Sequence, residues 1–371
     1  MNPETEFCPN EACESSGRVG AGNIRVHDRK RRRYRCTDCG KTFSARQRTA
    51  MWWLKKPTEV FTVVVALMAH GCPIQAIVAA FGLDERTVNA WLKRAGVQCQ
   101  AVHNHVVTGQ PRDLGQVQAD EIKAKVQGGS IWMALAMTVS TRLWLGGAVS
   151  PRRDSALIED LIGQVRAMAL CRPLLLAVDG LASYVKAFRH AFRSPWPTGR
   201  VGRPRLIPWP DMAIVQVVKH RGAATFTIHR RIAGGSAALV EHLIRASQAG
   251  GTINTAYIER LNATFRQRLG CLARRTRHLA RQTATLSHGM YLVGSVYNFC
   301  THHDSLRVKV HLQVGWRASH RWVQRTPAMA AGLTDHRWSI AELLAFKVPP
   351  PPFVPPRRRG RPPKLRPALT S

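Results

Sequence analysis

The pattern of apolar and polar positions divides the chain into a helical region and a later region of mixed strands and helices. Apolar residues recur every three or four positions across residues 57–97, as on the buried face of a helix. Residues 115–126 alternate instead, which is typical of a strand with one buried face. Residues 174–178 are wholly apolar, as in a strand buried on both faces. The sequence therefore predicts a multidomain α/β protein.

The later region predicts a specific order of elements. Three strands come first, followed by a helix, the apolar strand and a basic amphipathic helix, which is how an RNase H-like mixed-sheet fold begins. In that fold the first and fourth strands lie side by side. The strands are expected at 115–126, 131–139, 142–149 and 174–178, and the helices at 154–170 and 181–193. Farther along we expect a Pro-, Gly- and Arg-rich loop at 195–210, a strand at 212–218, and helices at 236–248, around residue 259 and at 284–299.

Three carboxylates occupy positions where such a fold could gather them. Asp120 follows the alternating stretch, Asp179 ends the apolar strand, and Glu259 lies in a helical stretch. Asn262 and Arg266 share a helix face with Glu259, beside an apolar stripe. Two carboxylates at strand ends and one on a helix can bind two divalent ions for phosphodiester chemistry.

Glu121, next to Asp120, is an alternative candidate for the first metal-binding acid. Successive side chains of a regular strand point to opposite faces, so we expect only one of this pair to point into the site. Gln118 and Asp120 share one face, which favours Asp120. A single acid after a strand is often a solvated turn residue, so the hypothesis depends on the ordered set. Other acids compete with this set but fit it less well: Asp154, Glu159, Asp160, Asp211 and Glu241.

Four of the nine cysteines form two close pairs near the N-terminus. Four residues separate Cys8 from Cys13, two separate Cys36 from Cys39, and 22 lie between the pairs. Two thiol pairs at this spacing can complete a tetrahedral zinc site. Residues 1–46 can bury little core, so one structural Zn²⁺ would supply the folding energy of a zinc ribbon. The alternative is four unrelated thiols or disulfides.

The helical region predicts a DNA-binding helix-turn-helix at 57–97. Gly82 makes the turn, Asp84 N-caps the second helix and Gly96 ends it. A polar linker is expected at 98–113. The alternative is an ordinary helical hairpin. The second helix is expected to face a DNA groove with Arg86, Thr87, Asn89 and Lys93, and the core with Val88, Trp91 and Leu92.

The balance of charge predicts a polyanionic partner. Lys and Arg number 55 against 22 Asp and Glu, which gives a formal net charge of +33. Double-stranded DNA is therefore the expected partner. The alternatives are that the chain is a ribosomal-type protein or a membrane-surface binder. No membrane partner is expected, because the longest apolar run, at 60–69, is too short to span a bilayer. The odd number of cysteines and a polar, acidic N-terminus indicate reduced thiols in a cytosol.

The C-terminal part predicts little defined structure. Residues 301–348 have no assigned role. From residue 349 the chain is rich in proline and then arginine, so we expect a disordered basic tail at 349–371. Arg359 and Arg361 belong to an Arg-Gly-Arg-Pro stretch that fits an A·T-rich minor groove. A merely solvated tail is an equal alternative.

Taken together, these motifs resemble DDE transposases of bacterial insertion sequences, in the group with an N-terminal zinc ribbon and helix-turn-helix. The matching stretches run from residue 8 to about 300, and a glutamate helix that leads into clustered arginines is the most specific of them. The chain departs from the family in the long stretch between Asp179 and Glu259, which are 80 residues apart and enclose the Pro- and Arg-rich stretch. The matching stretches are CPNEAC, YRCTDCGKTFS, PIQAIVAAFGLDERTVNAWLKRAG, VQADEI, LLLAVDG and YIERLNATFRQRLGCLARRTRHLA.

The resemblance implies a catalytic triad of Asp120, Asp179 and Glu259 in a domain at 114–300. It implies two Mg²⁺ ions, for which Mn²⁺ can substitute, nicking at element ends and strand transfer by the freed 3′ hydroxyl. A homo-oligomer on DNA is expected, in the bacterial cytoplasm at the nucleoid. Two alternatives stay open: a non-catalytic DNA-binding regulator or decayed transposase, and a structure-specific nuclease. DNA phosphates are expected to contact the basic residues Arg260, Arg266, Arg274 and Arg275.

Overall fold

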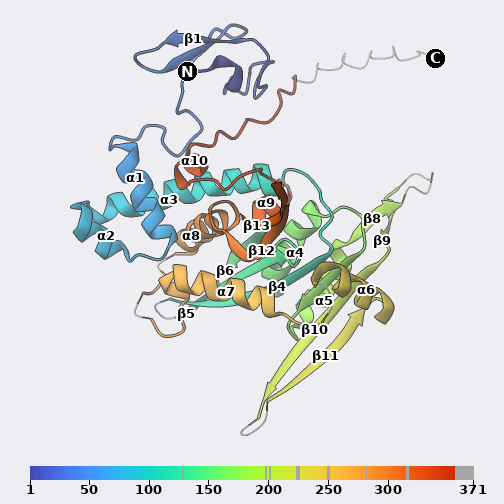
Figure 1. Ribbon diagram of the computed structural model, residues 1–371. Helices are drawn as coiled ribbons and strands as arrows, with labels where there is room; N and C mark the ends of the chain where they lie inside the picture. Colours follow the sequence, from blue (N-terminus) through green and yellow to red (C-terminus); the bar gives the residue numbers. More distant parts are fainter. Residues whose placement is uncertain are drawn as a thin grey trace, which may run out of the picture. The chain divides into compact units, whose positions relative to one another are not determined.

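The protein forms two compact units (Figure 1). Unit 1 contains Met1–Trp52 together with the chain from Lys347 onward, and unit 2 contains Trp53–Phe346. No helix among the described residues is long and apolar enough to cross a membrane. The computed structural model describes residues 1–126, 129–196, 199, 202–222, 226–248, 251–276, 278–280, 282–314 and 317–355.

Unit 1 is built on a three-stranded antiparallel sheet. Its core is small and, apart from cysteines, contains the buried side chains of Ile24, Tyr34 and Phe43. A core of this size contributes little stability on its own, so a further cross-link is expected. Its elements are the short 3-10 helix η1 (Pro3–Thr5) and the strands β1 (Ile24–Asp28), β2 (Arg33–Cys36) and β3 (Thr42–Ser44).

The start of the expected tail belongs to unit 1. A disordered segment was predicted from residue 349, but Pro350 is buried. Arg48 donates a hydrogen bond to the backbone just before this segment. Proline rings can thus cover a small domain that has little core of its own, which composition alone does not reveal. Arg359 and Arg361 lie outside the described residues.

Unit 2 begins with the predicted helices. Gly82 adopts the left-handed conformation, with φ of 58°, that ends the first short helix of the motif. Asp84 caps the next helix, because its carboxylate accepts a hydrogen bond from the Arg86 amide over 2.7 Å. Val88 and Trp91 are buried, as predicted. These helices are α1 (Thr58–Ala69), α2 (Ile74–Phe81) and α3 (Glu85–Val102).

Gly96 does not end α3, and the predicted linker at 98–113 is largely helical. The helix continues into the π-helical turn η2 (His103–Val107). A Cβ atom on Gly96 would lie 2.5 Å from Cβ of His288, which belongs to a later helix. The glycine therefore permits two helices to approach closely. Because of this packing, the region predicted as a separate domain at 57–97 is part of unit 2.

The sheet of unit 2 has six strands in the order β11-β10-β7-β4-β5-β6. It is mixed, because β7 pairs in parallel with β4 and β10, whereas the other neighbours are antiparallel. The predicted neighbourhood of the first and fourth strands is confirmed, since Gln116 and Gln118 pair with Leu175 and Ala177. The strands are β4 (Gln116–Val126), β5 (Gly129–Thr138), β6 (Trp144–Ser150), β7 (Leu174–Val178), β10 (Met212–Arg221) and β11 (Phe226–Gly234).

Helices cover both faces of this sheet (Figure 1). One face packs against α4 and α5, and the other against α6, α7 and α8. β7 is buried along its whole length, as its apolar sequence predicted. The helices are α4 (Ser155–Met168), α5 (Ala182–Ala191), α6 (Ala237–Gln248), α7 (Ala256–Arg268) and α8 (Thr283–Ser295), with the short turns η3 (Gly270–Leu272) and η4 (Val296–Cys300).

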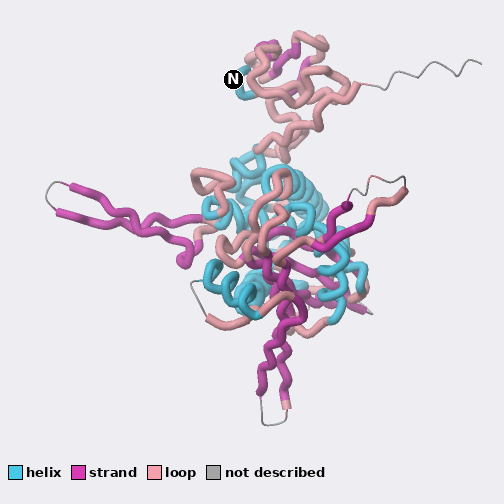
Figure 2. The backbone as a smooth tube through the Cα atoms, turned by 90° about the vertical axis from the view of Figure 1, so that its right-hand side faces the viewer, coloured by secondary structure: helices cyan, strands magenta, loops and turns pink. Residues whose placement is uncertain are grey.

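Strand pairs extend outward from unit 2 (Figure 2), and most of this structure was not predicted. β8 and β9 pair at residues 193–196 and 205–208, mostly within the stretch at 195–210 that was expected to be a loop. β12 and β13 pair within 301–348, and the end of β10 pairs with β11. Their side chains are largely exposed, so the alternation that marks a half-buried strand is weak. The remaining elements are β8 (Arg193–Trp196), β9 (Arg205–Pro208), β12 (His303–Val314), β13 (Arg317–Arg325), α9 (Pro327–Ala330) and α10 (Ile340–Ala345).

Candidate metal centre and acidic site

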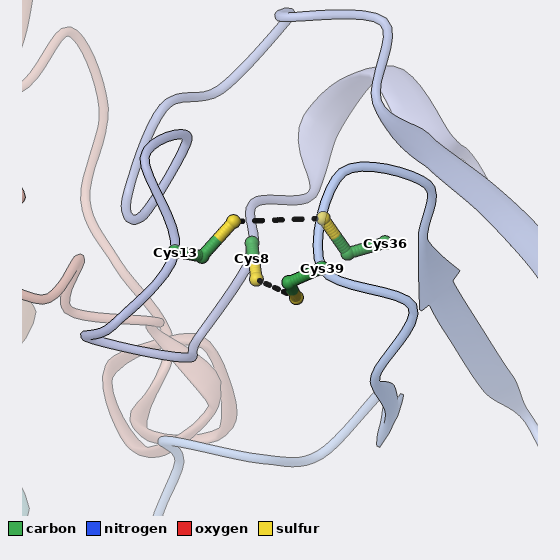
Figure 3. Close-up of side chains that lie close together, drawn as sticks. All are labelled: Cys8, Cys13, Cys36 and Cys39. Atoms are coloured by element: carbon green, nitrogen blue, oxygen red, sulfur yellow. Dashed lines mark hydrogen bonds between the residues drawn. The ribbon is translucent and has the colours of Figure 1, made fainter.

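The four predicted zinc ligands come together in unit 1 (Figure 3). The Sγ atoms of Cys8 and Cys39 lie 3.6 Å apart, those of Cys13 and Cys36 lie 3.9 Å apart, and all four are within 4.8 Å of one another. Four thiolates bound to Zn²⁺ at about 2.3 Å would stand roughly 3.8 Å apart at the corners of a tetrahedron. The donor set therefore fits a single zinc ion, and the sulfur separations do not fit disulfides.

Hydrogen-bond donors surround this cysteine cluster. The backbone amides two residues after Cys8, Cys13 and Cys39 donate to the respective sulfur atoms. Asn23 Nδ2 donates to Cys36 Sγ over 3.3 Å. Burial raises the pKa of Cys8 and Cys13, whereas on Cys39 the hydrogen bonds outweigh burial and lower the pKa to about 7. A bound cation would compensate the buried negative charge that four thiolates create.

Asp120 and Asp179 lie close together in unit 2. Asp179 directly follows β7, as predicted, but Asp120 lies in the middle of β4 and not at a strand end. The parallel pairing of β4 with β7 nevertheless stops at Gln118, two residues before Asp120. Both carboxylates therefore lie where two adjacent strands part, which is a common place for sites in open α/β sheets.

Glu121 joins these two carboxylates, although only one of Asp120 and Glu121 was expected to point into the site. One carboxylate oxygen from each of Asp120, Glu121 and Asp179 lies within 4.8 Å of the other two. The pairing of β4 with β5 is regular here, so the two neighbouring side chains leave opposite faces. They reach the same opening because β7 no longer covers this edge of β4 beyond Gln118. These three residues are the carboxylate cluster.

Buried polar contacts hold helix α7 beside Asp120. The Gln118 side-chain oxygen accepts hydrogen bonds from the amides of Tyr257 and Ile258, over 3.1 and 3.0 Å. Asn262, one turn farther along, donates its Nδ2 to Asp120 Oδ2 over 2.7 Å. Gln118 and Asn262 are both buried. The first turn of α7 is thus fixed to β4, and the orientation of the Asp120 carboxylate is fixed by Asn262.

Glu259 lies on α7 but outside the carboxylate cluster. It forms an ion pair with Lys219 of β10 and accepts a hydrogen bond from Thr255 Oγ1 over 2.6 Å. Burial opposes ionisation of Glu259, but the hydrogen bonds from Lys219 and Thr255 prevail and lower its pKa. Its negative charge contributes to raising the pKa of Asp120, so it lies near the cluster.

The carboxylate cluster is only partly neutralised by the protein. Arg153 Nη2 lies 3.0 Å from Glu121 Oε2 and 3.3 Å from Asp179 Oδ2. Burial and Asp179 raise the pKa of Glu121, although Arg153 opposes them. Asp120 makes no ion pair with any described residue, and burial together with Glu121 and Asp179 raises its pKa to about 7. The electrostatics therefore favour an added cation. Nothing in the sequence indicated that Arg153 contacts the acids, because this residue lies in a loop before α4 and belongs to no motif.

The four residues of α3 that were predicted to contact DNA differ in their exposure to solvent. Arg86 and Lys93 are exposed, whereas Thr87 and Asn89 are half-buried. Asn89 Nδ2 donates to the carbonyl oxygen of Glu85 over 3.0 Å, so its amide is engaged with its own helix. Of the four, the two cations are the most available to a ligand.

The predicted phosphate-contacting arginines divide into two groups. Arg266 is near the acids, whose charges partly offset the lowering of its pKa by burial and by Arg274. Arg274 and Arg275 are exposed. Arg260 instead lies near His303, whose pKa burial and neighbouring arginines lower to about 4. Arg266, with Arg274 near it, therefore lies on the side of α7 that faces the acids.

No protein-family model matches the chain, and a search of curated proteins found no match.

Proposed function

We propose that this protein is a DNA transposase of the DDE type. It binds the ends of an insertion sequence, cleaves a phosphodiester bond at each end and joins the freed 3′ hydroxyl to target DNA. The observation that carries this proposal is the convergence of Asp120 and Asp179 where β4 and β7 part, beside the helix that bears Glu259. The formal net charge of +33 supports a polyanionic substrate.

The acidic residues fit divalent ions by the chemistry of their donors. Carboxylate oxygens suit Mg²⁺ and Mn²⁺. Burial, together with Glu121 and Asp179, raises the pKa of Asp120, so a bound cation would favour its ionised form. Two bound ions would supply an activated nucleophile and stabilise the leaving oxygen. In this proposal Asp120 and Asp179 hold the ions, Asn262 orients Asp120, and Glu259 completes the triad.

DNA is held by several basic parts of the chain. Arg266, Arg274 and Arg275 neutralise backbone phosphates near the acids. Arg86 and Lys93 on α3 contact the element ends as part of a helix-turn-helix. The cysteine cluster with one Zn²⁺ forms a zinc ribbon. Two ends have to be cleaved together, so the active form is a homo-oligomer on DNA.

A strand-transfer assay tests the proposal. The protein is mixed with labelled duplexes carrying the ends that flank its gene, with a supercoiled plasmid and with Mg²⁺ or Mn²⁺. Joined products are expected from the wild type and none from Asp179→Asn. Glu159→Gln, which alters an exposed acid on α4, should keep full activity. Metal-dependent nicking without joining would identify a structure-specific nuclease, and DNA binding without nicking would refute catalysis.

Two further variants identify the third acid. Glu259→Gln should abolish joining if the triad is the one implied by the resemblance. Glu121→Gln should reduce activity less in that case, because the triad implied by the resemblance does not include Glu121. If Glu121→Gln instead lowers activity more than Glu259→Gln does, the third metal-binding acid is Glu121, a member of the carboxylate cluster.

A non-catalytic DNA-binding regulator is the second candidate. It is favoured by Arg153 and Lys219, which already form ion pairs with Glu121, Asp179 and Glu259. In a regulator these cations would permanently replace metal. Titration calorimetry with Mn²⁺ distinguishes the two: binding that Asp179→Asn removes supports the enzyme, and no binding supports the regulator.

A further inference from the structure

A cavity of about 710 Å³ lies between α5 and the strands β10 and β11. None of the acidic residues described above lines it. Its apolar wall is formed by Ala182, Val185 and Ala233. Gln216 and five basic side chains complete the lining. We call this site the basic pocket, after its basic residues Lys186, Arg189, His190, Arg193 and Arg231.

The basic face of α5 has no role in the core. Lys186, Arg189 and His190 follow one another at helical spacing on the exposed side of the helix. The opposite side buries Tyr184 and Phe188 against the sheet domain. The fold therefore requires only the apolar side of α5, and the cations of the other side are not needed to hold the helix in place.

The charges of the basic pocket are uncompensated. None of the five side chains forms an ion pair with a carboxylate among the described residues, whereas elsewhere Arg153 and Lys219 do. The arginines are positioned by neutral acceptors instead. Arg189 Nη2 donates to a backbone carbonyl of β11 over 2.6 Å, and Arg193 Nε donates to a backbone carbonyl over 3.0 Å. Such a concave surface concentrates positive potential and attracts anions.

We propose that the basic pocket binds phosphate groups of a DNA strand, a second contact for the substrate whose identity as DNA rests on the proposed function. Lys186 and His190 are four residues apart, about 6 Å along the helix. This is comparable to the distance between neighbouring phosphates of one DNA strand. The volume lies within the range of about 300–1,000 Å³ for ligand sites, so it has room for a sugar between the phosphates.

A buried glutamine connects the basic pocket to Asp179. Gln216 of β10 lines the pocket and is 1% exposed. Its side-chain oxygen accepts a hydrogen bond from Arg231 Nε over 2.9 Å. Its Nε2 donates to the carbonyl oxygens of Asp179 and Leu181 over 3.1 and 3.3 Å. A phosphate held by Arg231 is therefore positioned on the same framework as the Asp179 backbone.

A pair of charge-matched variants tests the basic pocket. Lys186→Gln/Arg193→Gln removes two pocket cations, and Arg172→Gln/Arg337→Gln removes two exposed cations elsewhere in unit 2. Fluorescence anisotropy with a labelled duplex is measured at several salt concentrations. Each lost phosphate contact lowers the salt slope by about 0.9. We expect the pocket variant to bind at least about tenfold more weakly and with a slope lower by about 2, and the control pair to change little.

Hydrogen exchange of the unaltered protein provides a measurement that does not depend on the variants folding. Exchange in α5 should slow when duplex DNA is added. An unchanged exchange rate, or equal losses of affinity in both double variants, would overturn the pocket while leaving DNA binding intact. Absence of any DNA binding by the wild type would instead remove the proposed function. Tight binding of pyrophosphate at the pocket, with DNA affinity unaltered in the pocket variant, would reassign the ligand to a free phosphate compound.

Discussion

The cysteine cluster of unit 1 and the carboxylate cluster of unit 2 are both suited to cations, but they are built differently. The cysteine cluster joins two pairs, each close in sequence, and its thiols have only neutral hydrogen-bond donors around them. The carboxylate cluster joins residues from separate strands and is partly neutralised by Arg153. A metal ion at the cysteines would therefore compensate for the small core of unit 1, whereas a metal ion at the carboxylates would bind beside the larger core of unit 2.

The largest expected effect is the loss of unit 1 when the cysteine cluster is broken. Cys36→Ser, or a strong chelator, should unfold unit 1, because structural zinc contributes about 10–16 kcal/mol in small domains. Zinc content and amide exchange of β1–β3 would report the change, while the sheet of unit 2 stays protected. Cys171→Ser, which alters an exposed thiol of unit 2, is the control. Retained protection of unit 1 in Cys36→Ser would contradict a metal-dependent fold.

Removing a charge from the carboxylate cluster should stabilise the metal-free protein, whereas breaking the cysteine cluster should destabilise unit 1. The pKa of Asp120 is about 7 in the folded protein and about 3.9 when unfolded. Its contribution to stability is thus complete below about pH 4 and is lost as the pH rises through 7. Asp120→Asn should therefore stabilise the metal-free protein by about 4 kcal/mol at pH 8, and by nearly nothing at pH 4. Urea unfolding at both pH values measures this, and a destabilised variant at pH 8 would refute the charge strain.

Acid should weaken unit 2 through His103. Burial lowers the pKa of this histidine to about 4, and its ring lies against Trp144 and Tyr291. The unfolded chain binds the proton near pH 6.5, so stability should fall between pH 6.5 and 4, and no further below that. The difference in unfolding free energy between wild type and His103→Gln should change by about 3 kcal/mol over this window. A constant difference would show that His103 is already charged or exposed.

The stability lost when the ion pair of Arg153 or that of Lys219 is broken should increase with the burial of the pair. Arg153→Gln leaves the buried Glu121 carboxylate without a partner and should cost about 1–3 kcal/mol in metal-free protein. Lys219→Gln alters a pair whose side chains are 38% and 45% exposed, and should cost less than about 1 kcal/mol. Thermal unfolding measures both variants. Added Mn²⁺ should recover the loss in Arg153→Gln, and equal costs without recovery would argue against a metal site.

Much of the local structure followed from the sequence. The wholly apolar strand at 174–178, the cap at Asp84 and the turn at Gly82 are set by neighbouring residues, and each was confirmed. The hairpins were not foreseen, because strands exposed on both faces have little alternation. Gly96 was misread as a helix end, since only the packing against His288 shows why a glycine is needed there.

The sequence by itself determined the two cysteine pairs, the order of the elements from β4 to α5 and the place of Asp179 after β7. Those features depend on residues close together in the chain, whose spacing fixes their geometry. The tertiary structure decided that Glu121 joins Asp120, that Arg153 bridges the carboxylates and that Glu259 pairs with Lys219. Most of these contacts join positions that are far apart in the chain, as does the hydrogen bond between Asn262 and Asp120, which are 142 residues apart. They form only when strand register and helix packing are in place.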